Sequence, residues 1–262
     1  MTVDRIVEKP SRTLPERGFL NGRLALVTGA ARRIGRQLAL ALAEQGVDIV
    51  LHHNESEFEA TMTADELRGH GVRVELVRAH LGDSFRAEDL VYRAADIMDR
   101  PVDILVNNAA MYYPGTAQDT SVRTWTEFQN VNLRAPWLMA RTMAETLGPD
   151  GTGDVINLND AAALRPRADH FAYTMSKWAL HGLTKNLAVA LAPNIRVNEL
   201  ALGSVLPPEP STGDYEHVVR EDIPLERFPK PEEVASAMLY LLANASLTGQ
   251  TLYLDGGENL AQ

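Results

Sequence analysis

Tyr173 and Lys177 stand four residues apart in a stretch, residues 173–191, whose composition suits a helix. At that spacing both side chains leave one face of a helix and can meet. A free phenol, with a pKa of about 10, is a poor acid or base at neutral pH, but a neighbouring ammonium favours the phenolate. We therefore expect Lys177 to lower the pKa of Tyr173 and to make the phenol a general acid or base. Alone, the spacing fits a surface tyrosine beside a solvated lysine equally well.

A glycine-containing turn follows the first apolar run of the chain. Residues 23–28 predict a buried strand, residues 29–35 a turn that begins and ends with glycine, and residues 36–45 a helix. In this arrangement, backbone N–H groups and the helix N-terminus can hold a pyrophosphate. The turn departs from the usual three-glycine pattern, so alone it is weak support for a nucleotide site.

Strand and helix patterns alternate along the rest of the chain. The apolar runs that predict further strands are residues 47–52, 72–77, 102–106, 154–159, 195–200 and 251–254. The helical patterns cover residues 56–69, 85–98, 121–147, 173–191 and 231–242. We expect Ser56 and Glu59 to cap the first of these helices, and Pro136 to start a second helix within the third. The alternation predicts a doubly wound α/β fold of the Rossmann type, with a parallel sheet and helices on both faces.

The end of the second strand bears on the choice of dinucleotide. A site that selects NAD needs a carboxylate there to bind the ribose 2′-hydroxyl. The sequence has His53 and Asn54 at this point, while Arg32 and Arg33 in the glycine turn supply charge for a 2′-phosphate. These residues favour NADP, although Glu55 is close enough to weaken the argument.

Polar and aromatic residues follow the fourth strand, where ligands gather in such sheets. Asn107, Asn108 and Ala109 end this strand. Residues 111–114 are either a turn with partly buried aromatic rings or a stacking wall for a flat substrate. Farther on, residues 203–228 contain four prolines and no regular pattern, which predicts a substrate lid.

The composition of the 262 residues indicates one domain, residues 21–262, after an arm of residues 1–20 that is flexible or lies across a neighbouring subunit. The lack of cysteine excludes disulfides and thiolate chemistry, and the histidines have no partners at ligand spacing, so we expect no metal. A net charge of −10 argues against nucleic-acid and membrane partners. Without a membrane-spanning run or a signal sequence, we expect a cytoplasmic protein that acts on a small molecule.

Taken together, the motifs resemble those of the short-chain dehydrogenase/reductase family. They occur in family order over residues 22–257 and are Thr28-Gly-Ala-Ala-Arg-Arg-Ile-Gly35, Asn107-Asn-Ala-Ala110, Asn132, Tyr173-x-x-x-Lys177, Ile195-Arg-Val-Asn198, Pro231-Glu-Glu-Val-Ala235 and Thr248-Gly-Gln-x-x-x-x-Asp-Gly-Gly257. Seven ordered matches are far more specific than any one of them. The resemblance implies a parallel sheet of seven strands, a nicotinamide cofactor and a homotetramer.

Within the family, three residues resemble the pteridine reductases. Arg33 replaces the middle glycine of the phosphate loop, similar to an arginine that those enzymes direct at pyrophosphate and substrate. Tyr112 lies where they have a phenylalanine that stacks on the pterin, and Asp160 replaces the catalytic serine thirteen residues before the tyrosine. The positions that depart from the pattern are Glu55, His80 and Leu202, which replace an arginine, an aspartate and a proline.

The exchange at residue 160 has a chemical reason. A carbonyl that is being reduced gains negative charge on oxygen, which a serine hydroxyl stabilises and a carboxylate opposes. A ring nitrogen must instead be protonated, and a carboxyl group can donate a proton to it or accept hydrogen bonds from neighbouring N–H groups. Asp160 therefore favours a C=N bond in a heterocycle, unless its side chain only caps a local turn.

The resemblance implies roles for three sets of residues. The expected catalytic residues are Asp160, Tyr173, Lys177 and Asn132. The residues expected to bind NADPH or NADP+ are Gly29, Arg32, Arg33, Ile34, Gly35, His53, Asn54, Asn108, Ala109, Tyr173, Lys177, Gly203 and Ser204. The residues expected to bind the substrate are Arg33, Tyr112, Asp160 and Tyr173.

Our hypothesis is an NADPH-dependent reductase of a pterin-like substrate, such as a dihydropterin or dihydrofolate, or of a related heterocyclic C=N bond. One alternative is a carbonyl reductase or alcohol dehydrogenase in which Asp160 is incidental. Another is a binding protein that senses NADP(H) without turnover. The intact Asn132, Tyr173 and Lys177 speak against a sensor, because such a protein needs no proton relay.

Overall fold

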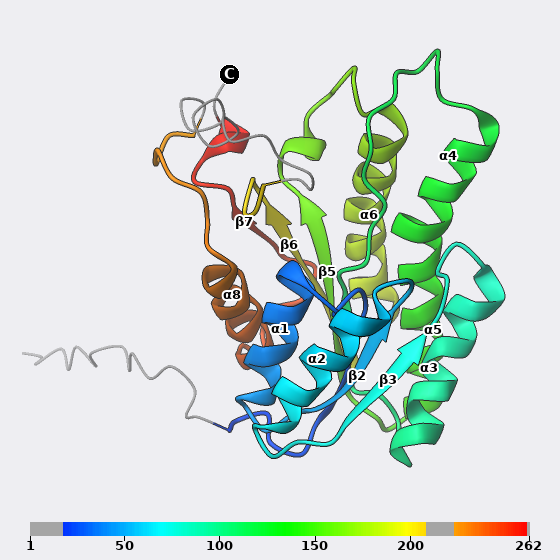
Figure 1. Cartoon of the computed structure of the whole chain (residues 1–262), viewed down its shortest axis with the longest axis vertical. Helices are drawn as coiled ribbons and strands as arrows, with labels where there is room; N and C mark the ends of the chain where they lie inside the picture. Colours follow the sequence, from blue (N-terminus) through cyan, green and yellow to red (C-terminus); the bar gives the residue numbers. More distant parts are fainter. Residues whose placement is uncertain (1–17, 208–222, 261–262) are drawn as a thin grey trace, which may run out of the picture.

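The computed structural model describes residues 18–207 and 223–260, and within them seven parallel strands form one sheet in the order β3-β2-β1-β4-β5-β6-β7 (Figure 1). The strands are β1 (Leu24–Val27), β2 (Asp48–His53), β3 (Val74–Arg78), β4 (Ile104–Asn107), β5 (Gly153–Asp160), β6 (Ile195–Leu202) and β7 (Thr251–Leu254). The α-helices are α1 (Arg33–Ala43), α2 (Glu57–Arg68), α3 (Ser84–Met98), α4 (Val122–Gln129), α5 (Ala135–Leu147), α6 (Phe171–Ala190) and α8 (Pro231–Ala243). The shorter segments are η1 (Asn130–Arg134), η2 (Ala162–Leu164) and η3 (Glu258–Leu260).

Both faces of the sheet are covered. Helices α1, α2 and α8 pack on one face, and α3, α5 and α6 pack on the other (Figure 1). Successive residues of a strand point to opposite faces, so Leu26 and Val27 of β1 belong to different apolar clusters. A sheet buried on both sides explains why the strands are continuous apolar runs, and it confirms the predicted doubly wound fold.

The two halves of the sheet meet between β1 and β4. The chain adds β2 and β3 on one side of β1 and then crosses to β4 on the other side. Ligands of such sheets bind in the crevice at the carboxyl ends of the strands, at the point where the order reverses. Gly29 lies two residues after the end of β1 and Asn108 directly after β4, so both lie at this crevice.

One of two expectations about helix ends is wrong. Ser56 precedes α2, but its side chain makes no capping hydrogen bond, so the predicted capping box with Glu59 does not form. Pro136 lies in the first turn of α5, as expected for a proline that starts a second helix, and the π-helical turn η1 joins this helix to α4. Proline cannot donate to the carbonyl of Asn132, and its ring would clash with that carbonyl in a regular α-helix. A wider turn accommodates the proline without a break.

The predicted arm and lid lie mostly outside the described residues. Residues 1–17 are not described, but Leu20 is 3% exposed and packs in the core, so the fold begins before residue 21. Of the predicted lid, residues 208–222 are not described. The described helices include none that is long and apolar enough to cross a membrane.

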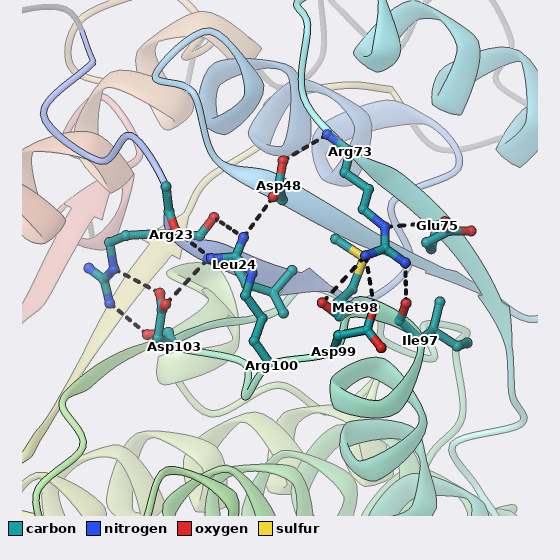
Figure 2. Close-up of polar contacts among 11 residues, drawn as sticks. Arg23, Leu24, Asp48, Arg73, Glu75, Ile97, Met98, Asp99, Arg100 and Asp103 are labelled. Atoms are coloured by element: carbon teal, nitrogen blue, oxygen red, sulfur yellow. Dashed lines mark hydrogen bonds and ion pairs between the residues drawn. The ribbon is translucent and has the colours of Figure 1, made fainter.

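Ion pairs bind the strands together at the amino ends, opposite the crevice. Arg23, just before β1, donates to Asp103 at 2.8 Å and to Asp154 at 2.7 Å, and Arg196 reaches the second oxygen of Asp154 at 2.6 Å. Figure 2 shows part of this network, in which Arg100 joins Asp48 at 2.7 Å. These contacts link β1, β2, β5 and β6, and they fix the relative positions of strands whose carboxyl ends carry the candidate site.

Candidate active site

Asp160 and Tyr173 come together at the carboxyl end of β5. The strand delivers Asp160, helix α6 delivers Tyr173, and the phenol donates a 2.8 Å hydrogen bond to Oδ2 of the carboxylate. The other oxygen, Oδ1, accepts from the backbone N–H of Ala163 at 3.0 Å. Asp160 therefore does cap a local turn, but it uses only one oxygen for this and binds Tyr173 with the other.

The pKa of Tyr173 moves in the direction opposite to the one expected. Burial and the negative charge of Asp160 raise it well above the ordinary value, so the phenol holds its proton. Lys177 lies with Nζ 5.8 Å from the centre of the phenol ring and donates instead to the carbonyl of Leu158 at 2.9 Å. Burial lowers the pKa of Lys177 to about 8, with Asp160 and Glu199 opposing the shift. The expectation failed because neither the burial of Tyr173 nor its contact with Asp160 can be read from the spacing of Tyr173 and Lys177.

Asn132 lies in the π-helical turn η1 and faces α6. Its Oδ1 accepts from the backbone N–H of Met111 at 2.8 Å, while Nδ2 contacts the carbonyl of Met111 at 3.1 Å and Oγ of Ser176 at 3.0 Å. Lys177, one of the two partners that the resemblance implies, is not among these contacts. Asn132 thus holds the loop after β4 against the helix that carries Tyr173.

Tyr112 stands over the pair as a half-exposed ring. It stacks on His170 with centroids 4.9 Å apart and meets the ring of Tyr173 edge-on at 4.8 Å. Tyr112 was expected here from the sequence, whereas His170, the N-cap residue just before α6, had no signal beyond its place near Tyr173. The three rings form an aromatic wall beside the Tyr173 hydroxyl, which suits a flat substrate.

The turn after β1 is tightly packed. Gly29 has a φ of +62°, and a Cβ on Gly35 would lie 2.3 Å from the carbonyl oxygen of Gly29, so neither position tolerates a side chain. Asn108 donates through Nδ2 to the carbonyls of Thr28 at 2.8 Å and of Gly29 at 3.0 Å, and Ala109 donates from its N–H to Thr28 Oγ1 at 3.0 Å. The turn is thereby fixed to the end of β4, with helix α1 starting directly behind it.

The two arginines of this turn differ in direction. Arg32 is exposed at the N-cap of α1. Arg33 adopts a φ of +55°, and its guanidinium donates to the carbonyl of Pro207 at 2.7 Å. The side chain of Arg33 thus links the glycine turn of residues 29–35 to the segment that follows Gly203. Ile34 and Gly35 continue into α1.

The end of β2 offers no buried acid. His53 is 5% exposed, burial lowers its pKa, and its Nδ1 has no hydrogen-bond partner among the described residues. Asn54 and Glu55 are exposed. A buried imidazole nitrogen without a partner fits a ligand that supplies one. The N-terminus of α1, directly after the glycine turn of residues 29–35, is the kind of site that binds a pyrophosphate. The residues present therefore fit a dinucleotide.

Comparison with known proteins agrees with this geometry. The family model described as enoyl-(acyl carrier protein) reductase matches residues 29–259. Dehydrogenase/reductase SDR family member 4 of Sus scrofa is 33% identical over 96% of this chain and 92% of its own length. The chain belongs to the short-chain dehydrogenase/reductase family.

Two further relatives of this short-chain dehydrogenase/reductase differ in their substrates. FolM alternative dihydrofolate reductase 1 from Brucella canis, solved in complex with NADP, is 36% identical, with a TM-score of 0.85, over 92% of this chain and 96% of that chain. The 3-oxoacyl-[acyl-carrier-protein] reductase of Synechocystis sp. is 30% identical over 91% of this chain and 97% of its own length. Within the family, the chain is thus similar both to a dihydrofolate reductase and to a 3-oxoacyl-[acyl-carrier-protein] reductase.

One residue that sequence reasoning missed lies beside the expected cofactor residues Gly203 and Ser204. A Cβ on Gly203 would lie 2.8 Å from the Cα of Asp255, which brings the chain after β6 against the chain after β7. There the half-buried Glu258 accepts from the backbone N–H of Ser204, and burial together with the charge of Asp160 raises its pKa. Its position after two glycines gave no sign of a role in this short-chain dehydrogenase/reductase, because the contact depends on how the two segments meet.

Proposed function

We propose that this member of the short-chain dehydrogenase/reductase family is an NADPH-dependent reductase of a C=N bond in a flat heterocycle of the pterin class. The observation that carries the proposal is the 2.8 Å hydrogen bond from the phenol of Tyr173 to the carboxylate of Asp160. It is supported by the likeness to a dihydrofolate reductase of the FolM type that was solved with NADP.

The residues proposed to hold the cofactor lie along the crevice from β2 to α6. Gly29 and Gly35 would admit the pyrophosphate to the N-terminus of α1, with Arg32 and His53 near the adenosine ribose. Lys177 would hold the nicotinamide ribose, as the family resemblance implies. When bound, NADPH supplies the hydride that reduces the ring carbon.

The proton would come from the Tyr173–Asp160 pair. The raised pKa of Tyr173 keeps one proton on the phenol, within hydrogen-bond distance of the carboxylate. A basic ring nitrogen that contacts this pair could take the proton, and the negative charge left behind would lie near the ammonium of Lys177. A ketone oxygen would gain negative charge beside the carboxylate and be opposed by it, so the pair favours a nitrogen.

The aromatic wall would set the shape of the substrate. Tyr112 is half-exposed and rests on His170 and Tyr173, so a heterocycle could stack on its open face. Arg33 would contact the substrate, as the family resemblance implies, from the segment after Gly203, where its guanidinium donates to the carbonyl of Pro207. A pterin combines a flat face with several N–H groups and so matches both the ring and the carboxylate.

A carbonyl reductase is the second candidate. Asp160 also caps the turn at Ala163, which is a structural use of the residue, and the 3-oxoacyl-[acyl-carrier-protein] reductase is similar over nearly the whole chain. In that case the carboxylate would have no part in the reaction, and the phenol of Tyr173 alone would donate a proton to the substrate oxygen.

The test compares wild type, Asp160→Asn and Asp160→Ser in NADPH oxidation with a dihydropterin or dihydrofolate and with a panel of simple ketones. Asparagine keeps the turn cap at Ala163 but not the charge, and serine restores the hydroxyl usual in the family. We expect wild type to reduce the pterin and both variants to lose roughly 10²–10⁴-fold in kcat/KM. Activity on ketones alone, kept or improved by serine, would establish the carbonyl reductase instead. Binding of NADPH with no turnover on either panel would favour the sensor.

A further inference from the structure

A chain of buried polar side chains crosses the sheet beneath α6. Asn107 Nδ2 donates to Asn157 Oδ1 at 2.8 Å, and Asn157 Nδ2 donates to Thr184 Oγ1 at 2.9 Å. The hydroxyl of Thr184 lies 3.2 Å from Oε2 of Glu199 on β6. All four residues are at most 4% exposed, and Glu199 is 0% exposed. Nothing in the mechanism above uses this buried carboxylate.

In the described part of the chain, the carboxylate of Glu199 contacts four side chains that can donate hydrogen bonds. His181 Nδ1 lies 2.9 Å and Thr251 Oγ1 3.3 Å from Oε1, while Asn159 Nδ2 lies 3.0 Å from Oε2, next to Thr184. A buried charge costs several kcal/mol unless such partners compensate for it. An apolar side chain at this position would need no hydrogen-bonding partners. The free-energy cost of burying a carboxylate here therefore suggests that its charge has a function.

The side chain of Asn159 connects Glu199 to the active site by hydrogen bonds. Its Nδ2 donates to the backbone carbonyl of Lys177 at 3.1 Å as well as to Glu199, and its Oδ1 accepts from the backbone N–H of Asp160 at 2.9 Å. A carboxylate can only accept, so it forces the NH2 group of Asn159 toward itself and toward Lys177. The amide oxygen is then left facing Asp160. One oriented amide thus joins the strand end to the catalytic helix.

The charge of Glu199 also acts on Lys177. Burial lowers the pKa of this lysine to about 8, and the carboxylates of Asp160 and Glu199 oppose that shift. The other titratable groups packed around the cluster are His181 and Lys185 on α6 and Tyr253 on β7.

We propose that Glu199 is a positioning residue of the active site, whose buried carboxylate orients Asn159 and thereby fixes Lys177 and Asp160 relative to each other. The inference rests on the proposed function only for the roles of Tyr173, Lys177 and Asp160. It extends the site to a residue that touches neither substrate nor cofactor.

The test is a double-mutant cycle of Glu199→Gln and Asn159→Ala, assayed with whichever substrate class wild type reduces. We expect each single variant to lose roughly 10–100-fold in kcat with little change in KM, because misplacement of a catalytic group acts on the transition state. We expect the double variant to lose no more than the worse single one, because both changes remove the same link. In Glu199→Gln the alkaline limb of the pH profile should also move to lower pH, because a charge that raises the pKa of Lys177 is gone.

The matched control is Asn198→Ala, on the same strand. Asn198 is buried and bonds Leu247 and Gln250 but contacts no proposed catalytic residue. It should lower the thermal midpoint while kcat and the alkaline limb stay as in wild type. Multiplicative losses in the double variant, or the same shift of the limb in the control, would overturn the proposal. If Glu199→Gln does not fold, unchanged kcat in folded Asn159→Ala would overturn it.

A readout without substrate separates this proposal from the proposed function. NADPH binding, followed by nucleotide fluorescence against pH, depends on the charge of Lys177 whatever the substrate is. If wild type binds NADPH but reduces nothing on either panel, the proposed function fails. The positioning role then still predicts that binding weakens at a lower pH in Glu199→Gln than in wild type or Asn198→Ala, and identical binding profiles would refute it.

Discussion

The buried His52 uses both ring nitrogens in hydrogen bonds, one of them to Gly29 in the glycine turn of residues 29–35. It is 2% exposed, and its Nδ1 accepts from the N–H of Gly29 at 3.2 Å while Nε2 contacts the carbonyl of Ala79 at 3.0 Å. These partners fix the neutral tautomer with its proton on Nε2. Burial lowers the pKa of His52 to about 4, so the native protein resists a second proton on this ring.

This histidine should make stability depend on pH. Between its unfolded pKa of about 6.5 and its folded pKa of about 4, the unfolded chain binds more protons, so stability falls as pH falls through that range. The shift corresponds to about 3 kcal/mol lost by pH 4. We expect His52→Asn to remove this part of the pH dependence, as measured by urea unfolding from pH 8 to pH 4.

Thr63→Val is the control for that measurement. Thr63 donates to the carbonyl of Ala31 at 2.8 Å and so supports the same turn without a titrating group. Its loss should cost about 1 kcal/mol at every pH. An unfolding free energy that falls equally steeply in wild type and in His52→Asn would show that His52 is not the group that titrates.

The residue types were readable from the sequence, but their states were not. The spacing of Tyr173 and Lys177 and the aspartate at residue 160 pointed to the pair that the structure brings within hydrogen-bond distance. The pKa of Tyr173 was expected to fall and instead rises, because it depends on burial and on which oxygen of Asp160 faces it. Glu199 was not singled out from the sequence, because the side chains that contact its carboxylate come from three other segments.

At the scale of elements, the ion pairs at the amino ends of the strands should matter more than those on the surface. Asp154 has a side chain 7% exposed and receives both Arg23 and Arg196 (Figure 2 shows Arg23 at this edge). Removing it leaves two largely buried guanidinium groups without their shared partner. We expect Asp154→Ala to lower the free energy of unfolding by about 2–4 kcal/mol in chemical denaturation.

Glu66→Ala is the matched control, because Glu66 pairs with Arg36 where both side chains are about 40% exposed. It should cost less than about 1 kcal/mol. Both variants should bind NADPH as wild type does, since Asp154 lies at the sheet edge opposite the crevice. Equal destabilisation by the two changes would mean that burial does not govern these pairs.

The order of strands and helices was predictable because apolar runs and helical periodicity are local patterns. Their ends were less so. Ser56 is a residue type that commonly caps helices, but its side chain makes no capping bond. The π-helical turn η1 could not be predicted, because the proline that follows it fits the start of an ordinary helix equally well. That turn places Asn132 against Ser176, a contact that depends on the wide turn and not on any spacing of residues.

For the whole molecule, the cofactor should be a source of stability. A ligand that binds only the folded state at 100 times its Kd contributes about 2.7 kcal/mol. For a chain of this size that should raise the thermal midpoint by roughly 5–10 °C. We expect this shift with NADPH and a smaller one with NADH at the same concentration. Arg32→Ala should reduce the difference between the midpoint shifts caused by NADPH and by NADH. If the two nucleotides shift the midpoint of the wild type equally, the argument that the site binds a 2′-phosphate fails.

The homotetramer and the cytoplasmic location that follow from family resemblance and composition stay predictions, as does a lid over residues 203–228. The parts of the chain that form the proposed site are spread from Gly29 to Glu258. No fragment of the domain therefore contains the whole site.

The position of Glu199 also has a consequence while the chain is being made. Its partner Thr251 lies 52 residues later, on the last strand, so during synthesis β6 forms the edge of the sheet before β7 can pair with it. An unpaired apolar edge invites pairing with another nascent chain, and a charge pointing inward on such an edge opposes that pairing. Before β7 pairs with β6, the carboxylate of Glu199 should oppose such pairing by its charge, and in the folded protein the same carboxylate is enclosed in the core.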